Sequence, residues 1–204
     1  MKKRLILLLP LLFLALAAGC ASSGKAAGGH DVIIIPRSAW GALDPKPFKP
    51  HVPNRITIHH EGEYLSPDSS AAEKIKKTQV WGMGKDRNWA DIPYHFMIDA
   101  HGKIFEGRNV FTAGETNTTY DPTGHLLITC LGNFEEQKVT DEQLSSLVDL
   151  LAYCCNKYNI SPETIKGHKD YADTLCPGKD LYKYLQDGSL IKRVKVVLKE
   201  KYGK

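Results

Sequence analysis

Short apolar runs alternate with amphipathic segments along most of the 204-residue chain. Five runs have the length and composition of β-strands, and three of them are almost continuously apolar, which is typical of strands covered on both faces. The expected strands are residues 31–35, 55–60, 94–99, 103–106 and 126–131. The intervening Ala100-His101-Gly102 predicts that the third and fourth strands form a hairpin.

Helical periodicity occupies several of the segments between and after these strands. The clearest apolar stripe runs over 140–158, where Thr140 and Gln143 fit the pattern of a capping box. Further helices are expected at 69–80, from Ser161-Pro162-Glu163 onward, at 180–186 and at 191–202. Together these elements predict one α/β domain with a mixed central β-sheet flanked by helices on both faces.

The N-terminus has the composition of a targeting signal. A basic start precedes the apolar run 5–18, whose 14 residues are too short to cross a bilayer as a helix. The run therefore indicates a signal peptide. Residues 16–20 also resemble a bacterial lipobox, although Ala17 stands where Leu is more common, and this pattern implies that Cys20 becomes an acylated N-terminus. Plain secretion with a spare cysteine is the alternative.

The predicted organisation has three parts. Residues 1–19 form a lipoprotein signal peptide, residues 20–33 a lipid-anchored flexible tether, and residues 34–204 the folded domain. The Gly-rich stretch 21–30 spans roughly 15–20 Å as a random coil, which places the domain near the membrane. Ala21, in place of the Asp that retains lipoproteins in the inner membrane, favours the cell envelope's outer membrane, with the domain facing the periplasm.

Net charge argues against a nucleic-acid partner. The formal charge of the whole chain is +4, but three of its basic residues belong to the signal peptide. Without them, 24 basic residues face 23 acidic ones, so no basic excess remains to neutralise phosphates. We expect a monomer whose membrane contact is the lipid anchor.

Candidate metal ligands occur in two distant segments. His59 and His60 end the expected strand 55–60, and because neighbouring side chains alternate, one of them is a candidate ligand. His168 and Cys176 lie eight positions apart with turn-forming residues between them. Zinc accepts nitrogen and sulfur ligands, and a catalytic zinc typically has three from the protein. A hydrogen-bonded structural histidine and a buried or disulfide-bonded cysteine are the alternatives.

A third segment carries aromatic side chains. In residues 89–99, Tyr94 shares one strand face with Phe96 and Ile98, while His95 takes the other face. Tyr94 could hold its hydroxyl in a cleft or belong to the core. Glu106, Gly107 and Arg108 follow the hairpin.

Taken together, these segments resemble the zinc-dependent N-acetylmuramoyl-L-alanine amidases of the type shared by phage lysozyme-like amidases and peptidoglycan recognition proteins. The resemblance rests on residues 36–42, 58–60, 89–96 with 106–108, 131–134 and 168–178. It implies one Zn²⁺ per domain, held by His59, His168 and Cys176. It also implies catalytic roles for Tyr94 and Thr174. The expected substrate-binding residues are His60, Trp89, His95 and Arg108.

The resemblance also implies the reaction. The expected substrate is peptidoglycan or a muropeptide, cleaved at the amide between N-acetylmuramic acid and L-alanine. A module on the same fold that binds peptidoglycan without cleaving it is the main alternative, and a zinc amidase with another amide substrate is a weaker one. Cys176 favours the enzyme, because non-catalytic relatives typically lose this ligand.

Two departures concern the groove and the general base. Residues 113–116 and 119–125 differ from the pattern usual in the family, in a stretch that tends to line the substrate groove. Thr129 stands where more distant amidases carry a Glu, which leaves Glu61 as the fallback carboxylate. The remaining cysteines, Cys130, Cys154 and Cys155, are expected to be buried core thiols rather than disulfide partners, with a bond from Cys130 to the helix over 140–158 as the alternative.

Overall fold

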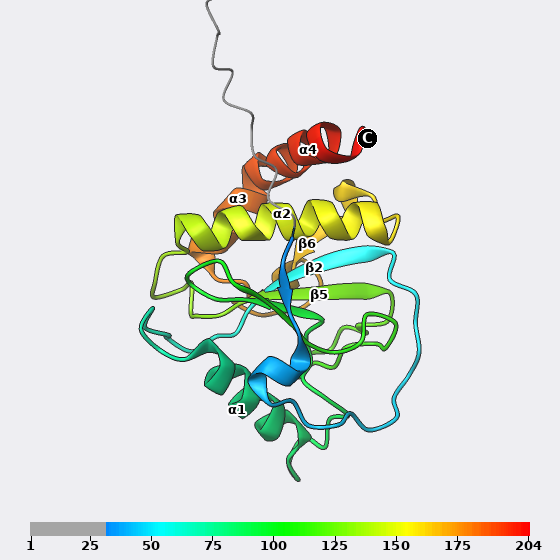
Figure 1. Cartoon of the computed structure of the whole chain (residues 1–204), viewed down its shortest axis with the longest axis vertical. Helices are drawn as coiled ribbons and strands as arrows, with labels where there is room; N and C mark the ends of the chain where they lie inside the picture. Colours follow the sequence, from blue (N-terminus) through cyan, green and yellow to red (C-terminus); the bar gives the residue numbers. More distant parts are fainter. Residues whose placement is uncertain (1–31) are drawn as a thin grey trace, which may run out of the picture. The chain divides into compact units, whose positions relative to one another are not determined.

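The computed structural model describes residues 32–204, so the predicted signal peptide and most of the predicted tether lie outside the described residues. A six-stranded sheet has the order β1-β4-β3-β5-β2-β6 (Figure 1). Its strands are β1 (Ile34–Ile35), β2 (Arg55–His60), β3 (Phe96–Ile98), β4 (Ile104–Glu106), β5 (His125–Cys130) and β6 (Ile165–Gly167). Only the β3–β4 hairpin pairs antiparallel. The predicted mixed sheet and hairpin are confirmed.

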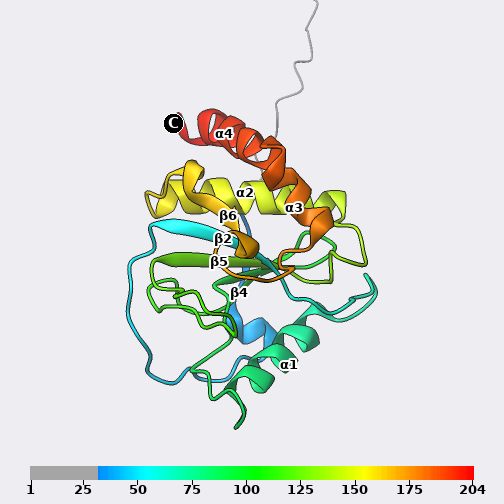
Figure 2. The ribbon, with the colours of Figure 1, turned by 180° about the vertical axis from the view of Figure 1, so that it is seen from behind.

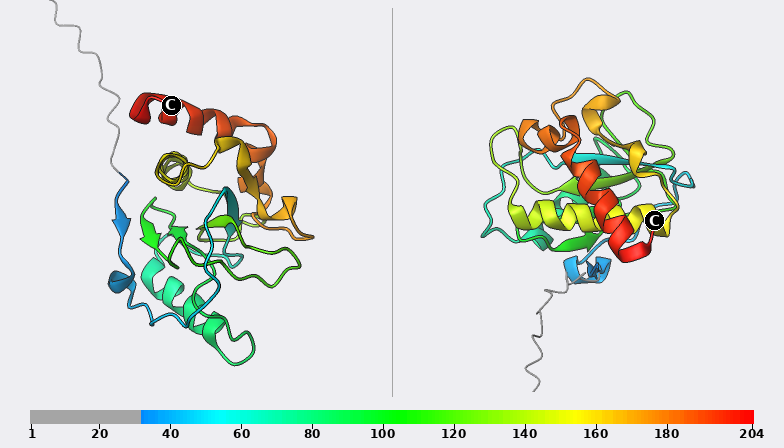
Figure 3. Two further views of the ribbon diagram at one scale, coloured as in Figure 1. Left: turned by 90° about the vertical axis from the view of Figure 1, so that its right-hand side faces the viewer. Right: turned by 90° about the horizontal axis from the view of Figure 1, so that it is seen from above.

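Helices cover both faces of this sheet, as expected. They are α1 (Ala71–Met83), α2 (Asp141–Lys157), α3 (Lys179–Gln186) and α4 (Ser189–Tyr202). In the views of Figures 1 and 2, α1 lies on one side of the sheet and α2 on the other. Figure 3 shows α2 end-on between the sheet and α4, so α4 forms an outer layer. None of the helices in residues 32–204 has the length and apolar character needed to cross a membrane.

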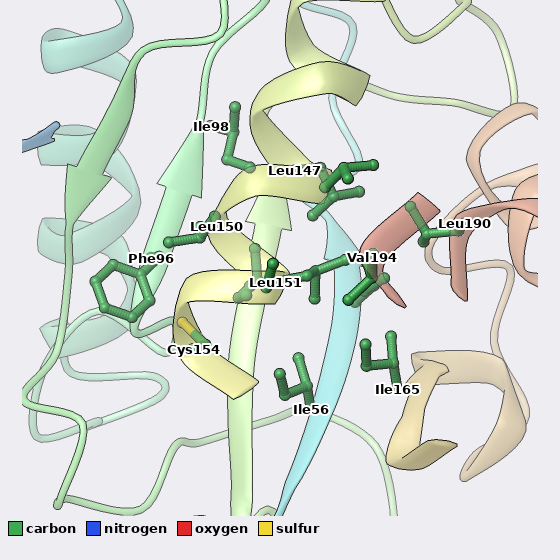
Figure 4. Close-up of a cluster of buried hydrophobic side chains, with 14 of the residues drawn as sticks. Ile56, Phe96, Ile98, Leu147, Leu150, Leu151, Cys154, Ile165, Leu190 and Val194 are labelled. Atoms are coloured by element: carbon green, nitrogen blue, oxygen red, sulfur yellow. The ribbon is translucent and has the colours of Figure 1, made fainter. Parts of the chain in front are cut away.

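The larger core fills the space between the sheet and α2 (Figure 4). Alternation along β3 divides its side chains: Phe96 and Ile98 join this core, whereas Met97 joins a smaller one that includes Ile75 of α1. The thiols of Cys130, Cys154 and Cys155 lie in the larger core and are free, which confirms the expectation of buried, unpaired cysteines.

The segment after α2 differs from the prediction. A helix was expected from Ser161, but Pro162–Thr164 forms a single 3-10 turn and the chain then enters β6. Thr164 donates its hydroxyl hydrogen to the Ser161 carbonyl at 2.7 Å, and β6 pairs in parallel with β2. The hydrogen bonds between β6 and β2, together with the burial of Ile165, favour a strand here over the helix that Ser161-Pro162-Glu163 predicts.

The start of α2 follows half of the expected capping box. The Thr140 hydroxyl accepts a hydrogen bond from the Gln143 backbone N–H at 3.1 Å. The Gln143 side chain is buried, however, and donates to the carbonyl oxygens of Ile98 at 2.9 Å and Leu131 at 3.2 Å. Gln143 thus joins α2 to β3 and to the loop after β5.

Candidate metal centre and cleft

The candidate site begins where β2 ends. Strands β5 and β6 flank β2 in parallel, so the carboxyl ends of all three meet at one edge of the sheet. His59 pairs with Thr129 of β5 in the sheet. It is buried, with 4% of the residue exposed. His60, the last residue of β2, is half-buried and accepts a hydrogen bond at Nδ1 from the Phe134 N–H.

A closed loop brings His168 and Cys176 to this edge. The Lys169 N–H donates to the Cys176 carbonyl at 2.9 Å, which joins the two ends of the loop. The Cys176 Sγ accepts from the His60 N–H at 3.3 Å and lies 3.5 Å from His59 Nδ1. One ligand atom each from His59, His168 and Cys176 lies within 4.8 Å of the other two. The three predicted ligands are thus brought together.

These three side chains have the chemistry of a zinc site. Burial lowers the pKa of His168 to about 4 and that of His59 well below its ordinary value. Neighbouring imidazoles make a smaller contribution in both cases. Both rings are therefore neutral at pH 7, the form that binds metals. Burial raises the pKa of the Cys176 thiol to about 12, so a nearby cation would be needed to keep it as a thiolate. The 3.5 Å between Cys176 Sγ and His59 Nδ1 matches the separation of about 3.5 Å between two ligand atoms of a tetrahedral zinc site.

Two residues that the sequence did not single out contact the histidines from outside. The Thr118 hydroxyl lies 2.8 Å from His168 Nε2, and the Tyr120 hydroxyl lies 3.5 Å from His59 Nε2. Tyr120 belongs to the segment 119–125, and Thr118 lies between the two segments, 113–116 and 119–125, that were expected near the groove. Residues 115–118 line the cleft, and their contact with substrate stays a prediction.

The cluster opens into a cleft of about 600 Å³. Its lining includes Tyr94, Thr174, His60 and Trp89, so these predicted residues reach the cleft. Tyr94 lies beside His59, with 5.4 Å between ring centroids. Burial, and secondarily Cys176, raises the pKa of Tyr94. The Thr174 hydroxyl accepts from the Cys176 N–H at 3.2 Å.

Two predicted substrate-binding residues do not reach the cleft. His95 is fully buried; its Nδ1 accepts from the Leu127 N–H at 2.8 Å and its Nε2 lies 3.0 Å from the Thr112 carbonyl oxygen. Arg108 is 1% exposed and donates to the carbonyl oxygens of Ile92 and Asp91. Neither side chain lines the cleft: backbone groups hold His95 in the interior, and backbone carbonyls together with Glu115 hold Arg108 there. Their role in substrate binding stays a prediction.

Cleft carboxylates are held in ion pairs. Glu115 pairs with the buried Arg108 and also accepts from the Ala90 N–H at 2.8 Å. Glu61 is 2.9 Å from Lys74 of α1, and both side chains are largely buried. Lys74 also pairs with the exposed Glu63. Glu61, the fallback carboxylate, is therefore already engaged by a cation.

Fold and site together define an α/β domain with a metal-type His–His–Cys cluster in an open cleft. The chain belongs to the N-acetylmuramoyl-L-alanine amidase family, whose model matches residues 49–179. That range contains His59, Tyr94, His168, Thr174 and Cys176.

Similar proteins include both recognition proteins and amidases. Peptidoglycan recognition protein 1 of Bos taurus is 29% identical over 92% of this chain and 94% of its own length. Peptidoglycan recognition protein-LE, solved in complex with tracheal cytotoxin (monomeric diaminopimelic acid-type peptidoglycan), is 30% identical with a TM-score of 0.68, over 76% of this chain and 92% of that one. The amidase LysC from Clostridium intestinale is 28% identical with a TM-score of 0.62, over 78% and 97%.

The Arg108–Glu115 pair yields a stability prediction. In Glu115→Ala, the buried guanidinium loses its only carboxylate partner among the described residues, and we expect a loss of about 3–5 kcal/mol in the free energy of unfolding. The matched control is Glu63→Ala, because Glu63 pairs with Lys74 from a side chain that is 75% exposed and should cost less than about 1 kcal/mol. Urea denaturation measures both. Equal losses would contradict the distinction.

Proposed function

We propose that this protein is a zinc hydrolase that cleaves the amide between N-acetylmuramic acid and L-alanine in peptidoglycan. The observation that carries the proposal is the convergence of His59, His168 and Cys176 at the cleft of a member of the amidase family. The sequence likeness to the solved amidase supports the same reaction. We propose peptidoglycan or a muropeptide as the substrate because relatives are named for recognising peptidoglycan.

The donor set fits zinc. His59 and His168 are neutral imidazoles, and Cys176 is a buried thiol that receives the His60 N–H, a bond that favours the thiolate. When bound, zinc lowers the pKa of a coordinated water to about 7 and polarises a carbonyl. The chain's own contribution is to hold these ligands on a strand end and a closed loop, which limits their motion.

Tyr94 and Thr174 would act on the oxygen that becomes negative. The Tyr94 phenol is protonated at neutral pH, and burial raises its pKa further, so it can donate a hydrogen bond to that oxygen. The Thr174 hydroxyl uses a lone pair on the Cys176 N–H, so its proton can be donated into the cleft. Glu61 and Glu115 are neutralised by Lys74 and Arg108, and we assign neither the role of general base.

Recognition without cleavage is the second candidate function. Relatives named as peptidoglycan recognition proteins favour it, and one of them is solved with a bound muropeptide. The presence of all three candidate ligands favours hydrolysis. The two functions predict the same binding and differ in whether the bond is cut.

The activity test uses purified peptidoglycan and counts newly exposed L-alanine amino groups. We expect the wild-type chain to expose L-alanine amino groups, a chelator to abolish this activity, and added Zn²⁺ to restore it. Cys176→Ser should lose bound zinc and slow release at least about 100-fold, since it removes a ligand rather than a neighbour of one. His60→Ala is the matched control and should retain zinc. Binding to peptidoglycan with no release would establish the recognition function instead.

Thr118 provides a second test through metal affinity. Its hydroxyl lies 2.8 Å from His168 Nε2, a contact that would fix the orientation of the ring. Thr118→Val keeps the shape but removes this bond, and we expect zinc affinity to fall about 10-fold or more. Thr118→Ser should restore it, and Thr119→Val, at an exposed neighbour, should be neutral. Competition with a chromogenic chelator measures each value; unchanged affinity in Thr118→Val would refute the role.

We further propose that Cys20 is acylated and anchors the domain in the cell envelope, at the outer membrane and facing the periplasm. The support is the lipobox-like sequence before Cys20 and the flexible composition after it. Membrane fractionation tests the anchor: wild-type chain should sediment with membranes, and Cys20→Ala should be released or remain unprocessed. A wild-type chain cut elsewhere and wholly soluble would defeat the proposal.

A further inference from the structure

The C-terminal helices carry a charge opposite to that of the rest of the domain. Residues 179–204 contain eight Lys and Arg against three Asp and Glu, whereas residues 32–178 contain fifteen against nineteen. The overall balance near zero therefore conceals a basic end and an acidic body. Segregation of this kind marks a surface for an anionic partner.

The basic residues of α4 lie on its outer face. Leu190, Val194 and Leu198 are buried and belong to the larger core, together with residues of α2. The opposite face carries Lys192, Lys195 and Lys199 around Val196, which is 47% exposed. Glu163 pairs with Lys195 at the edge of this face. Exposed lysines around a small apolar centre suit the interface of a bilayer, where the side-chain stems bury and the ammonium groups meet headgroups.

The position of α4 separates this face from the cleft. Figures 1 and 3 show α4 beyond α2, on the side of the sheet opposite α1. The cleft, in contrast, is lined by residues of α1, among them Lys74 and Trp81. α4 also lies beyond residue 179, where the match to the family model ends. A partner on this face would therefore leave the cleft open.

The N-terminal end of the described chain lies on the same side. Val32 packs against the larger core, the one between the sheet and α2 and α4. The predicted acylation site, Cys20, is separated from Val32 by only eleven residues, so an anchored bilayer would lie within a few tens of ångströms of α4. The length of chain outside the structure thus favours a membrane over other polyanions.

We propose that the basic face of α4 (Lys192, Lys195, Val196 and Lys199) binds the surface of an anionic phospholipid bilayer and turns the cleft away from it. The contact is electrostatic, reversible and independent of whether the cleft cleaves or only binds peptidoglycan. It adds a second point of attachment to the proposed lipid anchor.

The test uses the chain from residue 20 onward carrying Cys20→Ala, so that neither the signal peptide nor acylation contributes, and vesicles of phosphatidylcholine with or without phosphatidylglycerol. We expect sedimentation with the anionic vesicles to exceed that with neutral ones several-fold, and to fall at high salt because screening shortens the range of the attraction. Lys192→Glu with Lys199→Glu should weaken anionic binding about 10-fold or more.

A matched control separates this face from total charge. Lys46→Glu with Lys85→Glu changes the net charge equally, at exposed positions in segments beside α1, and should bind like the parent. Equal binding to both kinds of vesicle, or equal loss in both double variants, would overturn the proposal. Tighter binding of the same face to a soluble polyanion such as polyphosphate would also overturn it, since the partner would then be a polymer.

Discussion

The candidate site depends on one constraint, the closure of the chain against the end of β2. β2 lies between β5 and β6 and runs parallel to both, so its last residues lie beside the loops that follow these two strands. The loop from His168 to Cys176 returns to this edge because the Lys169 N–H meets the Cys176 carbonyl. The thiol then receives the His60 N–H. Hydrogen bonds donated by two backbone N–H groups thus hold the sulfur at the strand end that carries His59.

A second layer of contacts holds the wall of the cleft. Arg108 and His95 do not line the cleft, yet both support the loop that does. Arg108 donates to the Ala113 carbonyl and pairs with Glu115, and His95 contacts the Thr112 carbonyl. That loop presents Thr118 and Tyr120 to the outer nitrogens of the two histidines. The buried guanidinium of Arg108 therefore acts on the site by holding the loop that carries Thr118 and Tyr120.

Sequence patterns predicted the elements that have strong periodicity. The apolar run of β2 and the stripe of α2 were recognisable because burial on two faces, or on one helical face, leaves a repeating signal. β6 left none, since its three residues include the exposed Lys166 and depend on pairing with β2. The three candidate ligands were found through family motifs. Thr118 was not, because its contact with His168 crosses fifty positions and no local pattern encodes it.

The distribution of charge follows a division of labour within the chain. The range matched by the family model contains strands β2 to β6, α1, α2 and the cleft, whereas β1 precedes it and α4 adds a layer after it. A single flexible tether fixes the distance of a domain from a membrane but leaves its rotation free, so the cleft of an anchored protein would face the polymer only part of the time. A second, weaker contact between the membrane and the side of the domain opposite the cleft would restrict that rotation. On this proposal, the lysines of α4 affect how often the cleft meets a large, immobile substrate, and leave its affinity for a small soluble fragment unchanged.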